Sequence, residues 1–221
     1  MTDNPPNGSL VIVIGMLKGG TGKTTSAVFL ALEAARRGRD VELLDGDLTS
    51  QSAHDWANLA RAAGQPLPFQ VTRYPYAEDI AEEITRRRAP GKVLVVDAGG
   101  GSAQFLEESC TQADALLMPL SPTAADARRL AATLTSAERA AARNPSPAGL
   151  YVCCTLVKAD RRTSQPRRWR EQLHADDRPL TDTVISDWVL YSDAFGLHPE
   201  HPGEYTPLMD ELAADMELTP A

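Results

Sequence analysis

The chain has 221 residues, of which 43% are hydrophobic and 24% charged, a composition typical of a soluble globular protein. This excludes a disordered chain, a collagen-like chain and a disulfide scaffold. The longest apolar runs, residues 10–17 and 113–120, are far shorter than the roughly 20 residues needed to span a bilayer. The net charge of −8 requires that any nucleic-acid binding come from a local basic patch or an assembled form.

Apolar runs alternate with helix-like stretches along the chain. In chain order we predict strand 10–17, helix 24–37, strand 40–44, helix 52–63, strand 69–74, helix 77–88, strand 92–96, helix 103–111, strand 115–120, helix 124–143, strand 150–157, helix 166–174, strand 183–185, a helical turn at 193–197 and helix 207–216. The pattern predicts an α/β fold, in which a mostly parallel, twisted sheet has helices on both faces. Residues 1–9 are expected to be a disordered tail and residues 10–221 a single domain.

The three cysteines, Cys110, Cys153 and Cys154, lack metal-type spacing. We interpret them as buried structural thiols, which suit a reducing cytoplasm.

The strongest motif follows the first predicted strand and opens the first predicted helix, and it reads Lys18-Gly19-Gly20-Thr21-Gly22-Lys23-Thr24-Thr25. Glycines let backbone N–H groups approach phosphate oxygens closely, and a helix N-terminus adds partial positive charge. Lys23 would supply a positive charge to the β- and γ-phosphates of a nucleotide, and Thr24 a hydroxyl to Mg²⁺. The strict pattern has glycine where this chain has Leu17. The run therefore predicts a deviant phosphate loop with an added Lys18.

Carboxylates follow two further predicted strands. Asp97 ends the apolar run VLVVD, which beside a phosphate loop predicts a Walker B residue that holds Mg²⁺ through water. Asp45 and Asp47 are two residues apart, so they share one side of an extended chain. The glycines 99–101 are expected to form a mobile loop that senses the γ-phosphate.

These motifs resemble those of the ParA/MinD family of deviant Walker A P-loop ATPases. The resemblance covers nearly the whole chain and rests on residues 18–25, on Asp45-Gly46-Asp47, on Asp97 and on Pro119-Leu120-Ser121-Pro122. It is strongest to the small ParA partition ATPases that lack an N-terminal DNA-binding domain. It implies the P-loop NTPase fold, ATP and Mg²⁺ as cofactors, and a homodimer that forms with ATP.

The resemblance also implies roles for single residues. The catalytic set is Lys18, which reaches the partner's nucleotide, Lys23, and Asp47, which positions the attacking water. The metal set is Thr24, Asp97 and Asp45, which supports the metal shell. The nucleotide contacts are Gly19, Gly20, Thr21, Gly22, Lys23, Thr24 and Thr25. The family motif continues from its aspartate as Asp-Pro-Gln, whereas here Leu48 follows Asp47 and the glutamine, Gln51, comes two places later.

Positive charge is concentrated at residues 158–170, where six basic side chains accompany a single acid, Asp160. Such a cluster can neutralise DNA phosphates without reading sequence. A solvated helix face is the alternative interpretation. The candidate DNA-binding residues are Lys158, Arg161, Arg162, Arg167, Arg168 and Arg170. The family resemblance also implies that Thr155, Lys158 and the loop after Ile185 lie where the family holds adenine.

The sequence leads to the hypothesis of a DNA partition ATPase. ATP would drive a sandwich dimer that binds DNA non-specifically, and a ParB-like partner would stimulate slow hydrolysis and release. The expected location is the cytoplasm, on the nucleoid. The alternative is a MinD-like or cargo-positioning ATPase that acts on a membrane or a protein cargo. Residues 208–221 are acidic and contain no basic residue, which disfavours the membrane.

Overall fold

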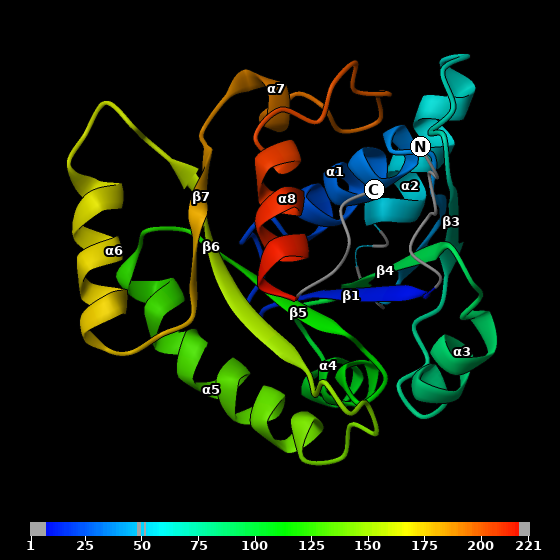
Figure 1. The fold of residues 1–221 in the computed structure, drawn as a ribbon. Helices are drawn as coiled ribbons and strands as arrows, with labels where there is room; N and C mark the ends of the chain where they lie inside the picture. Colours follow the sequence, from blue (N-terminus) through cyan, green and yellow to red (C-terminus); the bar gives the residue numbers. More distant parts are fainter. Residues whose placement is uncertain (1–7, 48–49, 51, 217–221) are drawn as a thin grey trace, which may run out of the picture.

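The computed structural model describes residues 8–47, 50 and 52–216, and a seven-stranded sheet forms its centre. All the strand pairs are parallel, and the order is β3-β2-β4-β1-β5-β6-β7 (Figure 1). The strands are β1 (Leu10–Gly15), β2 (Asp40–Asp45), β3 (Gln70–Arg73), β4 (Lys92–Ala98), β5 (Ala115–Leu120), β6 (Tyr151–Ala159) and β7 (Leu180–Ser186). The predicted tail lies outside the described residues except for Gly8 and Ser9.

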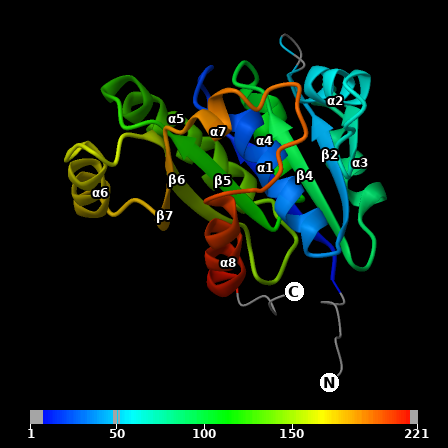
Figure 2. The same ribbon diagram turned by 90° about the horizontal axis from the view of Figure 1, so that it is seen from above.

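Helices cover both faces of the sheet, as the alternating pattern predicted (Figure 1). They are α1 (Lys23–Arg36), α2 (Ser52–Ala62), α3 (Ile80–Arg87), α4 (Ala103–Cys110), α5 (Ala124–Ala141), α6 (Gln165–Ala175), α7 (Val189–Ser192) and α8 (Tyr205–Asp215). Seen from above, the central strands run beneath α1, while α6 lies out beyond β7 (Figure 2).

Two apolar cores result from the alternation of side chains along the buried strands. In β1, Ile12 and Ile14 face the core that α1, α2 and α8 cover. Their neighbours Val11 and Val13 face the core that α3, α4 and α5 cover. The first strand is thus buried on both faces, and the α/β prediction is confirmed.

Residues 193–197 contain a hydrogen-bonded turn, in which the N–H of Leu197 donates to the carbonyl of Ala194 at 2.9 Å, but the helical turn predicted there is wrong, because the short helix α7 lies earlier, at Val189–Ser192. The N–H groups of Tyr191 and Ser192 donate to the carbonyl of Trp188, which starts the turn earlier. Gly196 has a φ of +78°, and this left-handed conformation cannot continue a right-handed helix.

The three cysteines are buried and unbridged, in agreement with the interpretation as structural thiols. Burial raises the pKa of each thiol, that of Cys154 to about 12. No helix in the part of the chain that the structure describes has the length and apolar character to cross a membrane.

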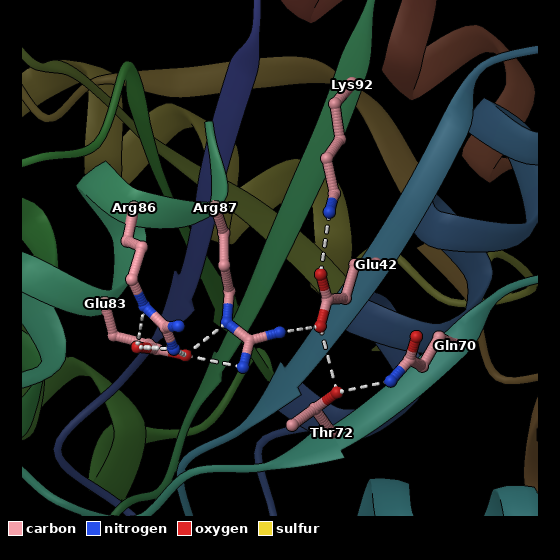
Figure 3. Close-up of polar contacts among 7 residues, drawn as sticks. All are labelled: Glu42, Gln70, Thr72, Glu83, Arg86, Arg87 and Lys92. Carbon is pink, nitrogen blue, oxygen red and sulfur yellow. Dashed lines mark hydrogen bonds and ion pairs between the residues drawn. The ribbon is translucent and has the colours of Figure 1, made fainter. Parts of the chain in front are cut away.

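A polar network ties α3 to the neighbouring strands (Figure 3). Glu42 on β2 is 5% exposed and accepts hydrogen bonds from Lys92 Nζ at 2.8 Å and from Thr72 Oγ1 at 2.9 Å. Arg87, near the end of α3, pairs with both Glu42 and Glu83. Glu42 is therefore the acceptor that joins a helix and three strands.

We predict that Glu42→Gln lowers the free energy of unfolding by about 2 kcal/mol, because Arg87 and Lys92 lose a charged acceptor in a partly buried setting. Urea denaturation checks this. Glu138→Gln, at an exposed position of α5, is the matched control and should unfold like the wild type. Equal midpoints for Glu42→Gln and the control would contradict the role given to Glu42.

Candidate nucleotide-binding site

The predicted site residues meet where three parallel strands end side by side. In the sheet register, Ile14 of β1 and Asp45 of β2 both align with Asp97 of β4. The loops that follow these strands consequently emerge at one edge, the position at which open α/β sheets bind ligands.

The loop between β1 and α1 has the backbone of a phosphate-binding turn. Gly20 and Gly22 have φ values of +77° and +86°, a region that residues with a side chain rarely adopt. Gly22 is also the N-cap of α1, and no side chain caps this helix. The first N–H groups of α1 are thus available to an anion, together with the positive end of the helix dipole.

The two lysines of the loop point to different acceptors. Lys23 is 7% exposed, and its Nζ donates to the carbonyl of Lys18 at 2.7 Å. Burial lowers the pKa of Lys23, although Asp97 and other nearby carboxylates oppose the shift. The Lys18 ammonium instead pairs with Asp126, which is buried near the start of α5.

Thr24 and Asp97 form the pair that the sequence predicted for a metal. Thr24 Oγ1 donates to Asp97 Oδ2 at 2.7 Å. Asp97 is 1% exposed, and burial raises its pKa to about 7. Asp97 Oδ1 and Thr21 Oγ1 are buried, and neither has a hydrogen-bond partner among the described residues. Because carboxylate and hydroxyl oxygens suit Mg²⁺, these residues fit a hydrated magnesium ion.

Asp45, also predicted for the metal set, accepts hydrogen bonds from two backbone N–H groups. Its Oδ1 accepts from the N–H of Asp47 at 3.1 Å, and its Oδ2 accepts from the N–H of His54 at 2.8 Å. It therefore supports the segment before α2. Within the described residues, no group of three acidic, histidine or cysteine side chains could hold a metal, so an ion here would depend on Thr24, Asp97, water and phosphate.

Asp47, the predicted water-positioning residue, lines the same cavity as the phosphate loop. Its carboxylate accepts from the N–H of Ser50 at 3.0 Å and from Ser50 Oγ at 2.8 Å. The departures from the family motif at Leu48 and Gln51 lie outside the described residues.

The glycines after β4 allow the loops to touch. A Cβ on Gly99 would lie 2.8 Å from the Cα of Asp47, and one on Gly100 would lie 2.7 Å from the carbonyl oxygen of Lys18. The loop after β4 therefore packs directly against both neighbouring loops. Its mobility stays a prediction.

A cavity of about 890 Å³ extends from the phosphate loop across the ends of β6 and β7. The loop and Asp47 line one part, and apolar or aromatic side chains line the other, among them Trp56, Val157, Ile185, Tyr191 and Phe195. A cavity of this size and character suits a nucleotide. The sequence analysis missed Trp56, Tyr191 and Phe195 as lining residues because they share no spacing or motif.

The predicted basic segment divides into two parts. Lys158 is exposed and lines the cavity, and its Nζ donates to the carbonyl of Gly20 at 2.8 Å. The arginines are held in ion pairs or exposed beyond the end of β6. The ion pairs are Arg161 with Glu204, Arg162 with Asp160, Arg167 with Glu171 and Arg170 with Asp182, and Arg168 is exposed.

A parallel α/β sheet, a left-handed glycine loop, a buried lysine and a threonine–aspartate pair together define a P-loop nucleotide-binding protein. The family model of the CobQ/CobB/MinD/ParA nucleotide binding domain matches residues 12–197. The chain belongs to this family.

Protein ParA of Rhizobium radiobacter is 35% identical over 119 residues, which make up 53% of this chain and 51% of that protein. The match thus spans about half the length of this curated relative.

Two solved structures have the same fold. A plasmid partition protein from Borrelia burgdorferi B31 bound to AMPPNP has a TM-score of 0.69 at 14% identity, covering 94% of this chain and 99% of that one. The septum site-determining protein MinD of Pyrococcus horikoshii, complexed with Mg-ADP, has a TM-score of 0.68 at 18% identity, covering 94% and 98%.

We predict that Asp126→Asn lowers the free energy of unfolding by about 1 kcal/mol at neutral pH, because Lys18 loses its anionic partner. Burial opposes ionisation of Asp126, but Lys18 and the Ser121 N–H outweigh it and hold its pKa below the usual value. A depressed carboxyl pKa stabilises the fold above the unfolded-state value of about 3.9, and this is lost as pH falls through the folded value. Urea denaturation of the wild type and of Asp126→Asn should give free energies of unfolding that converge as the pH falls. A difference between them that stays constant down to about pH 2 would refute the role given to the Lys18–Asp126 pair.

Proposed function

We propose that the chain is an ATP-dependent DNA partition protein that binds ATP and Mg²⁺ at the phosphate loop and hydrolyses ATP. The observation that carries this proposal is the Thr24–Asp97 pair beside Lys23, at one end of a cavity of nucleotide size. The curated ParA relative and the fold shared with plasmid partition proteins support the biological role.

In this proposal each loop has one task in hydrolysis. Lys23 exchanges the Lys18 carbonyl for the β- and γ-phosphates, and the loop amides bind the remaining oxygens. Thr24 and Asp97 hold Mg²⁺, which when bound neutralises charge on the phosphates. Asp47 orients the attacking water, and Asp45 fixes the segment that carries Asp47.

The ATP-bound form is a homodimer in this proposal, and residues 10–221 act as one domain. Lys18 leaves Asp126 and reaches the nucleotide of the partner subunit. A ParB-like protein stimulates slow hydrolysis, which separates the dimer and releases it from DNA. The protein then works in the cytoplasm, on the nucleoid.

Non-specific DNA binding is assigned to the exposed arginines that follow β6. The side chains of Arg162 and Arg167 are 91% and 82% exposed, and Arg168 is exposed as well. Their ion pairs with Asp160 and Glu171 are exposed, and such pairs hold weakly enough to exchange for DNA phosphates. A dimer would double the number of phosphate contacts and so link DNA affinity to ATP.

The two loop lysines should differ in their effects. Lys23→Ala should abolish ATP binding, because the buried cation at the phosphates is lost. Lys18→Ala should retain ATP binding by the monomer but lose the ATP-dependent dimer. Isothermal titration calorimetry and light scattering measure the two properties. Normal ATP affinity in Lys23→Ala would refute the phosphate-loop assignment, and dimers of Lys18→Ala would refute the cross-subunit role.

Binding to random-sequence DNA should require ATP and fall steeply with salt. Replacing both Arg167 and Arg168 with alanine should lower the slope of log affinity against log salt by about one for each phosphate that an arginine no longer neutralises. Fluorescence anisotropy over a salt series, with ATP, with ADP and without nucleotide, checks this. Vesicles of anionic lipid form a parallel arm. ATP-dependent binding to vesicles but not to DNA would favour the MinD-like alternative and overturn the partition proposal.

A further inference from the structure

Lys158 has a backbone conformation that is unusual for a lysine. Its φ is +53°, in the left-handed region that asparagine, aspartate and glycine adopt more readily. The register of β6 against β7 shifts between Leu156 and Ala159, so Lys158 lies in an irregular stretch of the strand. At this irregularity the side chain of Lys158 points toward the phosphate loop.

The side chain of Lys158 is hydrogen-bonded to Gly20 and passes close to Gly22, the two left-handed glycines of the loop. Its Nζ donates to the carbonyl of Gly20 at 2.8 Å. Its Cε would lie 4.0 Å from a Cβ on Gly22, and Val157 Cγ2 would lie 3.6 Å from the same point. The end of β6 thus packs on the turn that must present its amides to a ligand.

The hydrogen bond from Lys158 to Gly20 orients the whole peptide unit between Gly20 and Thr21. The C=O and N–H of a trans peptide unit lie in one plane and point in opposite directions. When Lys158 holds the carbonyl of Gly20, the N–H of Thr21 is fixed on the other side of the same plane. The N–H of Thr21 belongs to the set expected to bind phosphate, so its direction matters for affinity.

The positively charged Lys158 also lines the cavity. Among the described residues that line it, Lys23 and Lys158 are the two that carry positive charge. Lys23 comes from the phosphate-loop motif, whereas Lys158 comes from another strand, on the side where the apolar lining begins with Val157 and Ile185. Lys158 therefore adds positive charge between the polyphosphate end and the apolar end.

We propose that Lys158 is a positioning residue of the nucleotide site, which holds the phosphate loop in its binding conformation through the Gly20 carbonyl and favours a polyphosphate ligand. The proposal rests on the nucleotide site proposed above. It assigns Lys158 to the binding of ATP and ADP and not to the binding of DNA.

The test measures the affinity of the monomer for ATP and ADP by isothermal titration calorimetry, in low salt and without DNA. Lys158→Met keeps the aliphatic stem and removes the ammonium, and it should weaken both nucleotides about tenfold, as expected for the loss of a charged hydrogen bond. Lys158→Arg keeps the charge and should restore most of the affinity. Lys158→Asn fits the left-handed backbone and should bind as weakly as Lys158→Met.

Controls separate this proposal from others. Arg139→Met removes one positive charge from an exposed position on α5 and should bind ATP like the wild type. The melting temperatures of the nucleotide-free variants should match the wild type. ATP affinity unchanged in Lys158→Met and Lys158→Asn, or a loss of affinity matched by a fall in the nucleotide-free melting temperature, would overturn the proposal. A wild type that fails to bind ATP would instead overturn the proposed function itself.

Discussion

The candidate site depends on the parallel register of β1, β2 and β4. Asp97 aligns with Asp45 on one side and with Ile14 on the other, so the three loops that follow these strands begin at the same level. The register is strongly specified, because each strand contributes buried apolar side chains to both cores and a slip of one residue would exchange its two faces. The burial of valine, leucine and isoleucine thus sets the distance between Thr24 and Asp97, two residues far apart in sequence.

Around this edge, each lysine that touches the phosphate loop is held by an oxygen of the protein. Lys18 pairs with Asp126, while Lys23 and Lys158 donate to carbonyls of the loop itself. The loop is rich in glycine and has few side chains to pack. The contacts of the three lysines therefore help to hold it in place. They also concentrate positive charge where an anion would bind. The backbone of the loop is thus held in place before a ligand binds, whereas Lys18 and Lys23 would exchange these oxygens for phosphates in the proposed function.

Local sequence predicted the strands, most helices and the phosphate loop because each depends on residues close together in the chain. Continuous apolar runs identified β1 and β4, and the glycine–lysine run placed the turn before α1. The role of Lys158 could not be predicted in this way. It depends on a register shift between β6 and β7 and on a contact with Gly20, which lies 138 positions earlier. Charge counting grouped Lys158 with the arginines that follow it, and the family resemblance placed it near adenine, so neither indicated its contact with the phosphate loop. The bonds of Asp45 were missed for a similar reason, because its partners are backbone N–H groups that spacing does not reveal.

The basic segment at residues 158–170 contributes positive charge to two different places. Lys158 ends on the phosphate loop, and a few residues later Arg162 and Arg167 are exposed to solvent. One short stretch of chain therefore carries one charge of the nucleotide site and the charges assigned to DNA. The pairs with Asp160 and Glu171 hold these arginines against the surface locally, so their exchange for DNA phosphates needs no change at the nucleotide site. In the proposed function, the ATP dependence of DNA binding would follow from bringing two such surfaces together in a dimer, without a rearrangement within one subunit.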